Sequence, residues 1–163
     1  MSAELRDWMH NPTYSRGPEM IEKIMHAEKL LAIVLRSNYR AEGIVFFTPG
    51  DFSQQLGYMR RPAGHVIPPH VHNEVRREVT LTNEVLFVRS GRVRIDFYDE
   101  ERNYLESRVL VAGDIILLAQ GGHGFEMLEP SEMVEVKQGP YSGDADKTRF
   151  APAAPAGLRI VGG

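Results

Sequence analysis

The sequence predicts an all-β fold, built as a sandwich or barrel of short strands. Apolar segments of roughly four to eight residues follow one another along the chain, as strands do. Turns that contain Gly, Pro or Asp separate these segments, for example at 49–51 and 112–113. In one segment Val93, Ile95 and Phe97 alternate with charged residues, which is the two-residue period of a strand with one buried face. This pattern favours antiparallel strands over βαβ units.

The part of the chain that precedes the strands divides into an arm and a short helix. Residues 1–16 are polar and irregular. Pro18 suits the first position of a helix, and Glu19 falls in the first turn. Four apolar residues then share one helical face: Met20, Ile21, Ile24 and Met25. We therefore expect an arm and a short helix within residues 1–29.

Strands are expected from residue 31 onward. The first is 31–36, a β-branched apolar run. The others, in order, are 44–48, 55–61, 84–89, 92–98, 107–111, 114–119 and 133–138. They form one β-barrel domain over residues 30–150, and a flexible tail rich in Ala, Pro and Gly follows at 151–163.

Length, charge and composition exclude several classes of protein. The chain has 163 residues, the length of one ordinary domain. A net charge of −3 gives no electrostatic footprint for nucleic acid. The absence of cysteine excludes disulfides, thiolate metal sites and cysteine nucleophiles. The longest aliphatic run, 30–35, is too short for a membrane span, and residues 1–10 do not resemble a secretory signal, so we expect a cytoplasmic protein.

Histidines form the first candidate site. His70 and His72 stand two apart, so on a strand both imidazoles point to the same face and can reach one ion. Gly64 precedes His70 by five intervening residues, and Glu84 is followed by six residues and then Gly91.

Together with Gly121-Gly122-His123, this pattern resembles the two motifs of the cupin superfamily. The resemblance covers residues 45–140 and implies a single small jelly-roll barrel. It also implies one divalent metal bound by His70, His72, Glu84 and His123. The spacing leaves Glu78 as the alternative carboxylate, because eleven residues separate His72 from Glu84. We prefer Glu84, because the six-residue step from it leads to a glycine.

The implied ligand set favours a transition metal. Three imidazoles and one carboxylate suit Fe, Mn, Ni, Co or Zn rather than calcium. Four polar residues on or beside the predicted strands are candidates for substrate binding or proton transfer: Tyr58, Arg60, Glu126 and Lys137. Arg60 can pair with an anionic substrate, and the others serve where the strand alternation turns them inward.

The resemblance leaves two functions open. One is a metal-dependent enzyme acting on a small polar metabolite, by isomerisation or epimerisation or by Fe(II)-dependent dioxygenation. The other is a non-catalytic module that binds a metal or small ligand. Residues 46–58, 84–91 and 121–126 resemble small bacterial cupins found among polysaccharide and nucleotide-sugar genes, which favours a sugar or carbonyl substrate. The resemblance also implies a homodimer, paired through residues 30–48.

Overall fold

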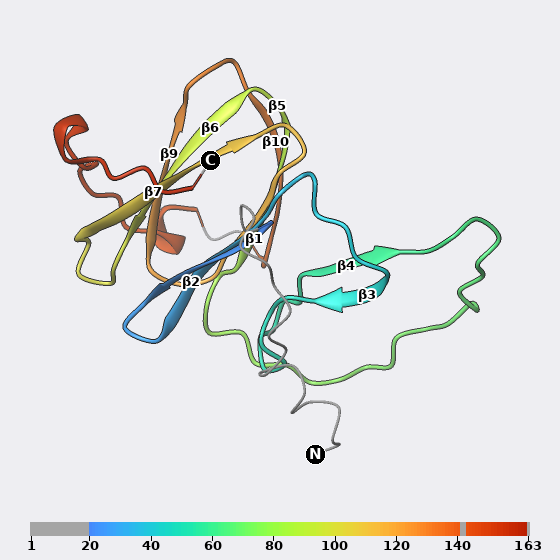
Figure 1. Cartoon of the computed structure of the whole chain (residues 1–163). Coiled ribbons are helices and arrows are strands. Elements are labelled where there is room, and N and C mark those ends of the chain that lie inside the picture. Colours follow the sequence, from blue (N-terminus) through green and yellow to red (C-terminus); the bar gives the residue numbers. More distant parts are fainter. Residues whose placement is uncertain (1–19, 141–142, 163) are drawn as a thin grey trace.

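The computed structural model describes residues 20–140 and 143–162, and within them the fold is all-β. Ten strands and two short 3₁₀ helices follow in order (Figure 1): β1 (Ile21–His26), β2 (Lys29–Leu35), β3 (Gly43–Phe46), β4 (Gly57–Arg60), β5 (Glu84–Ser90), β6 (Arg92–Tyr98), β7 (Tyr104–Val111), β8 (Ile115–Leu118), β9 (Gly122–Met127), β10 (Glu132–Lys137), η3 (Gly143–Asp146) and η4 (Pro155–Gly157). In the part of the chain so described, no helix has the length and apolar composition needed to cross a membrane.

The strands form three antiparallel sheets. The largest has the order β1-β2-β8-β5-β10, the second has the order β7-β6-β9, and β3 pairs only with β4. Every expected strand overlaps an observed one, from β2 to β8 and then β10. The β-rich class predicted from the sequence is therefore confirmed.

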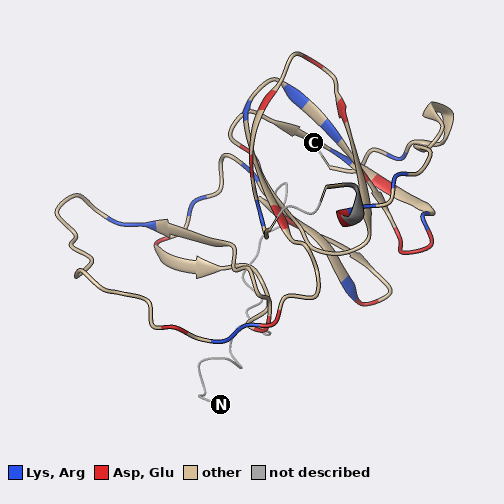
Figure 2. Ribbon diagram, turned by 180° about the vertical axis from the view of Figure 1, so that it is seen from behind, with Lys and Arg blue, Asp and Glu red and all other residues tan. Residues whose placement is uncertain are grey.

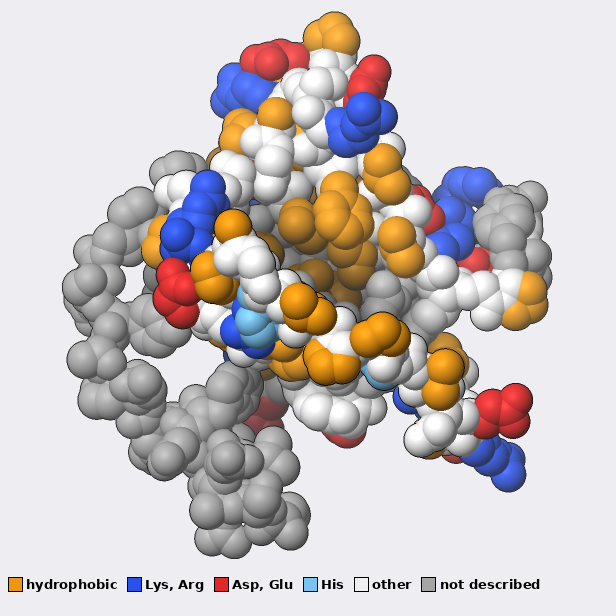
Figure 3. Space-filling model, turned by 90° about the vertical axis from the view of Figure 1, so that its right-hand side faces the viewer, with side chains coloured by type: hydrophobic (Ala, Val, Ile, Leu, Met, Phe, Trp, Pro, Cys, Tyr) orange, Lys and Arg blue, Asp and Glu red, His pale blue; other side chains and the backbone are white. Residues whose placement is uncertain are grey.

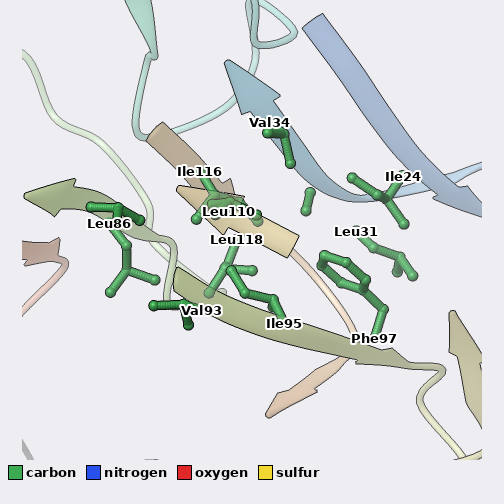
Figure 4. Close-up of a cluster of buried hydrophobic side chains, with 12 residues drawn as sticks. Ile24, Leu31, Val34, Leu86, Val93, Ile95, Phe97, Leu110, Ile116 and Leu118 are labelled. Carbon is green, nitrogen blue, oxygen red and sulfur yellow. The ribbon is translucent and has the colours of Figure 1, made fainter. Parts of the chain in front are cut away.

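The main core lies between the five-stranded and three-stranded sheets (Figure 4). Its buried members are Ile24, Leu31, Ala32, Val34, Leu86, Val88, Val93, Ile95, Phe97, Leu110, Ile116 and Leu118. They come from both sheets, because alternate residues of each strand point to the same face. We call this the inner face of each sheet. Burial of so many aliphatic side chains is the main force that holds the two sheets together.

A second core covers the outer face of the five-stranded sheet. There Ile33, Val85 and Leu117 pack against the segment that connects β3 to β4, including Phe47 and Leu56. Strands β2 and β8 are consequently buried on both faces, which explains why they read as continuous apolar runs.

The prediction of a helix after Pro18 is wrong for the residues that the structure describes there. Residues 21–26 form β1, which pairs with β2 across Ala27 and Glu28. Both turn residues have positive φ, 45° and 65°, as a two-residue hairpin turn requires. Ala-Glu lacks the Asn-Gly or Asp-Gly signature of such turns, so no hairpin was expected at this position. Pro18, Glu19 and residues 1–16 lie outside the described residues.

The other unexpected strand is β9. Its first half contains Gly122 and Gly124, residues that weaken strand propensity. A larger residue does not fit at Gly122, because a Cβ at this position would meet the ring of Phe150 and the Cβ of Tyr98. Part of the segment expected as a flexible tail is also paired, since Ile160 bridges Ser107 of β7 in parallel.

A segment of 23 residues between β4 and β5, residues 61–83, is called the long loop below. It carries no strand, and every side chain from 61 to 82 is exposed. It extends away from the two large sheets beyond the β3–β4 hairpin, and its first half, residues 62–73, carries no Lys, Arg, Asp or Glu (Figures 1 and 2). On this side of the molecule hydrophobic side chains gather around a recess (Figure 3).

Candidate functional site

Glu84 and His123 meet at one end of the inner faces. Glu84 begins β5 and lies opposite the buried Leu118, while His123 lies opposite Phe97 of β6. The His123 Nε2 atom is 3.2 Å from Glu84 Oε2, so the contact joins the two sheets. Hydrogen bonding to His123 lowers the pKa of the Glu84 carboxyl, against the opposing effect of burial. Glu84 is therefore an anion at neutral pH.

Lys137 extends this pair into a chain of charges. It lies opposite Glu84 in the register of β10 and β5, with its Nζ atom 3.6 Å from Glu84 Oε1. The same Nζ donates to Asp146 Oδ2 at 3.4 Å, and Asp146 belongs to η3. Burial alone would lower the pKa of Lys137, but Asp146 and Glu84 outweigh it and raise that pKa. The ammonium group is thus held in its charged form.

Apolar side chains flank the three polar groups on the inner face. Phe125 and Met127 follow His123 at two-residue steps on β9, opposite Ile95 and Val93. They are 39% and 47% exposed, although their partners on β6 are buried. The inner face is therefore open to solvent along β9. A cation, a carboxylate and an imidazole at the end of an apolar surface can orient a small polar ligand.

The structure does not bring His70 and His72 to this cluster. Both are exposed in the long loop, with their rings 5.3 Å apart and nearly perpendicular. His70 Nδ1 is 3.0 Å from the carbonyl oxygen of Pro68. Within residues 20–140 and 143–162, no group of three or more carboxylates and histidines is arranged to hold a metal. The four expected ligands therefore lie in two separate places, His70 with His72 and Glu84 with His123. The long loop that carries the first two forms no hydrogen-bonded ladder with a strand.

The structure also separates the two alternative carboxylates. Glu84 contacts His123 on the inner face, whereas Glu78 is exposed in the long loop. The structure thus brings Glu84, and not Glu78, into contact with His123.

Three of the four further candidates, Tyr58, Arg60 and Glu126, lie away from Glu84 in this structure. Tyr58 packs edge-on against Tyr39 in the core on the outer face of the five-stranded sheet, with ring centroids 4.9 Å apart. Arg60 forms an exposed ion pair with Glu42 at 3.0 Å.

The third of them, Glu126, is directed away from His123. It lies opposite Arg94 in the register of β9 and β6, and the two side chains form an ion pair at 2.7 Å. Because Glu126 is three residues from His123 on one strand, the two side chains point to opposite faces. Only Lys137, among the four, lies beside Glu84.

Sequence reasoning missed Asp146. Its contact with Lys137 depends on the path of the chain after β10, and no periodicity or motif in the sequence predicts that path. Comparison of the chain with family models, curated proteins and solved structures found no match. The inner-face cluster of Glu84, His123 and Lys137 is therefore the structural feature from which a function can be inferred.

Proposed function

We propose that this protein is a metal-binding jelly roll of the cupin type, which binds one divalent transition metal through His70, His72, Glu84 and His123. The observation that carries the proposal is the contact of 3.2 Å between Glu84 and His123. These two motif residues are 39 positions apart in the sequence and lie on different sheets, yet their side chains meet on the inner face.

The other two proposed ligands, His70 and His72, suit the same kind of metal ion. His70 and His72 have adjacent rings, and imidazole nitrogens with one carboxylate suit Fe, Mn, Ni, Co or Zn. The long loop leads directly into Glu84, since Asn83 is buried and donates to the carbonyl oxygen of Ala119. The eleven residues between His72 and Glu84 span up to about 36 Å when extended, which lets the loop close over the inner face.

The chain's own residues define the reaction that we infer. A bound metal supplies Lewis acidity, which polarises a carbonyl or hydroxyl oxygen of the substrate. Lys137 orients an anionic or electron-rich oxygen beside Glu84, and Phe125 packs against the apolar part of the ligand. The proposed activity is isomerisation or epimerisation of a small polar metabolite, a sugar or another carbonyl compound, in a cytoplasmic homodimer.

Elemental analysis of protein purified without chelators or a metal-affinity column tests this proposal. We expect near-stoichiometric metal in the wild type, and loss of most of it in His70→Ala and in His72→Ala. Loss of a hydrogen bond to one of a metal's ligands lowers metal affinity by about 10–100-fold, so removal of a ligand should lower it at least as much.

Two variants in the same segment provide matched controls. His65→Ala and Glu78→Ala remove a potential ligand from the long loop outside the proposed set, and both should retain the metal. Retention of metal by His70→Ala, or its loss in both controls, would contradict the assignment. Iron in the wild type would direct the assays to oxygen uptake, and protein with metal but without turnover on a metabolite panel would indicate a binding module.

A further inference from the structure

The chain that follows β10 crosses the end of the inner face where Glu84 and His123 meet. Asp146 holds Lys137 on one side of that end. On the other side, the Phe150 ring packs edge-on against Tyr98 with centroids 5.0 Å apart, and the Ala153 amide donates to the Tyr98 hydroxyl at 3.0 Å. Tyr98 pairs with Gly122, the residue before His123. We call residues 143–153 the strap.

An ion pair joins the strap to Lys137. The ion pair from Lys137 to Asp146 is long, at 3.4 Å, and both side chains are about one-fifth exposed, at 17% and 20%. Residues 147–149 are exposed. At 3.4 Å the contact is longer than an ordinary charge-assisted hydrogen bond, so it is weak enough for a competing anion to replace it.

We propose that the Asp146 carboxylate occupies the position in which Lys137 binds the acidic group of a ligand, and that a small carboxylate displaces the strap from Lys137. That this ligand is the substrate rests on the proposed function. The displacement itself depends only on Lys137 and Asp146.

Charge selects a carboxylate over a phosphate at this position. A monocarboxylate that takes the place of Asp146 carries the same single negative charge beside Lys137. A phosphate dianion would add a second negative charge near the Glu84 carboxylate, which lies 3.6 Å from the Lys137 ammonium. The site therefore favours a sugar acid, a hydroxy acid or a keto acid over a sugar phosphate.

Limited trypsin digestion of the full-length protein measures displacement of the strap, because Lys147 and Arg149 are cleavage sites within it. Acetate, the chemical equivalent of the aspartate side chain, is the probe. Sodium chloride at the same ionic strength is the reference, since salt alone screens the ion pair. Acetamide serves as the neutral analogue, and early cleavage products are quantified by mass.

In the wild type we expect acetate to accelerate cleavage at Lys147 and Arg149 by about two- to fivefold over chloride, the factor that corresponds to loss of one partly exposed ion pair. Acetamide should have no effect. Asp146→Asn should be cleaved at the faster rate even without acetate. Lys137→Met should also be cleaved at the faster rate, and acetate should not change its rate of cleavage.

A cleavage rate in acetate equal to that in chloride overturns the proposal, as does an acetate response that persists in Lys137→Met. Acceleration by inorganic phosphate but not by acetate overturns the choice of ligand class. His70→Ala separates the two proposals, because its strap should respond to acetate whether or not it has lost the metal. A metal-retaining His70→Ala with a normal acetate response would refute the proposed function alone.

Discussion

At the scale of single residues, Asp96 is a buried carboxylate on the outer face of the three-stranded sheet, held by three side-chain hydrogen bonds. Arg94 donates to both of its oxygens, at 2.8 and 3.0 Å, and the Ser107 hydroxyl donates at 2.5 Å. Burial alone would raise the pKa of Asp96, but these hydrogen bonds outweigh it and hold that pKa below its ordinary value of 3.8. Asp96 thus joins β6 to β7 as an anion.

Replacement of Asp96 by Asn should lower the free energy of unfolding by about 1–3 kcal/mol at pH 7, because Arg94 and Ser107 lose a charged acceptor. Since the folded-state pKa is depressed, the stabilisation is fully present above the unfolded-state pKa of about 3.8 and is lost as the pH falls through the folded-state pKa. Urea unfolding across this range checks both statements. A difference between wild type and Asp96→Asn that stays constant below pH 4 would contradict them.

Strand parity explains which site residues could be foreseen. Glu84, His123 and Lys137 each lie at or next to the end of a strand, and the partner strand places them on the inner face. Once His123 is taken as inward, Glu126 must point outward, because three residues separate them. For Tyr58 no such argument exists, since the β3–β4 hairpin belongs to neither of the two large sheets.

At the scale of elements, a network of buried charges fixes β1 to the rest of the molecule. Glu22 accepts hydrogen bonds from Arg36 at 2.6 Å and from Arg108 of β7 at 2.7 Å. Arg36 also reaches Asp114 at 2.9 Å, just before β8. The sheets are therefore joined along the β1–β7 side by ion pairs, in addition to the apolar core.

Glu22→Gln should destabilise the protein by about 2–4 kcal/mol, because it leaves two nearly buried guanidinium groups without their common carboxylate. The matched control is Glu100→Gln, which removes the exposed ion pair to Lys29 at 2.7 Å and should cost less than about 1 kcal/mol. Chemical denaturation of both variants measures the difference. Equal losses would mean that the network contributes no more than a surface pair does.

The elements themselves were largely predictable, and the two failures have separate causes. β6 has alternating apolar and charged residues and β8 is a continuous apolar segment, so both strands could be predicted from the sequence pattern. β1 has apolar residues at 21, 24 and 25, a spacing that also suits a helix, and only its pairing with β2 decides the matter. β9 begins with glycine, so local propensity argued against a strand that tertiary packing requires.

At the scale of the whole molecule, the two sides of the sandwich differ. The β1–β7 side is held by the charge network, whereas on the β9–β10 side Phe125 and Met127 remain exposed on the inner face. The long loop carries its own exposed apolar side chains, namely Val66, Ile67, Val71, Val75, Val79 and Leu81. Closure of this loop over the open side would bury both sets of apolar surface.

The proposed metal makes that closure measurable. Arg76 and Arg77 are trypsin sites in the long loop, in a region without strand structure. We expect cleavage there to slow by about tenfold when Ni²⁺ or Mn²⁺ is added at ten times its Kd, because only the closed form binds the ion through all four ligands. His70→Ala should show no protection. Protection of the wild type and of His70→Ala to the same extent would place the metal elsewhere.

The two-sided burial of β2 and β8 has a consequence for how this protein can change over evolutionary time. Residues such as Ile33 and Val34, adjacent on one strand, serve different cores, so a substitution in either strand must be accommodated in two packed layers. The long loop and the strap contribute to neither layer. Their residues can be exchanged for new ligand chemistry while the scaffold stays fixed, so the functional surface and the folding core of this chain are open to selection independently of each other.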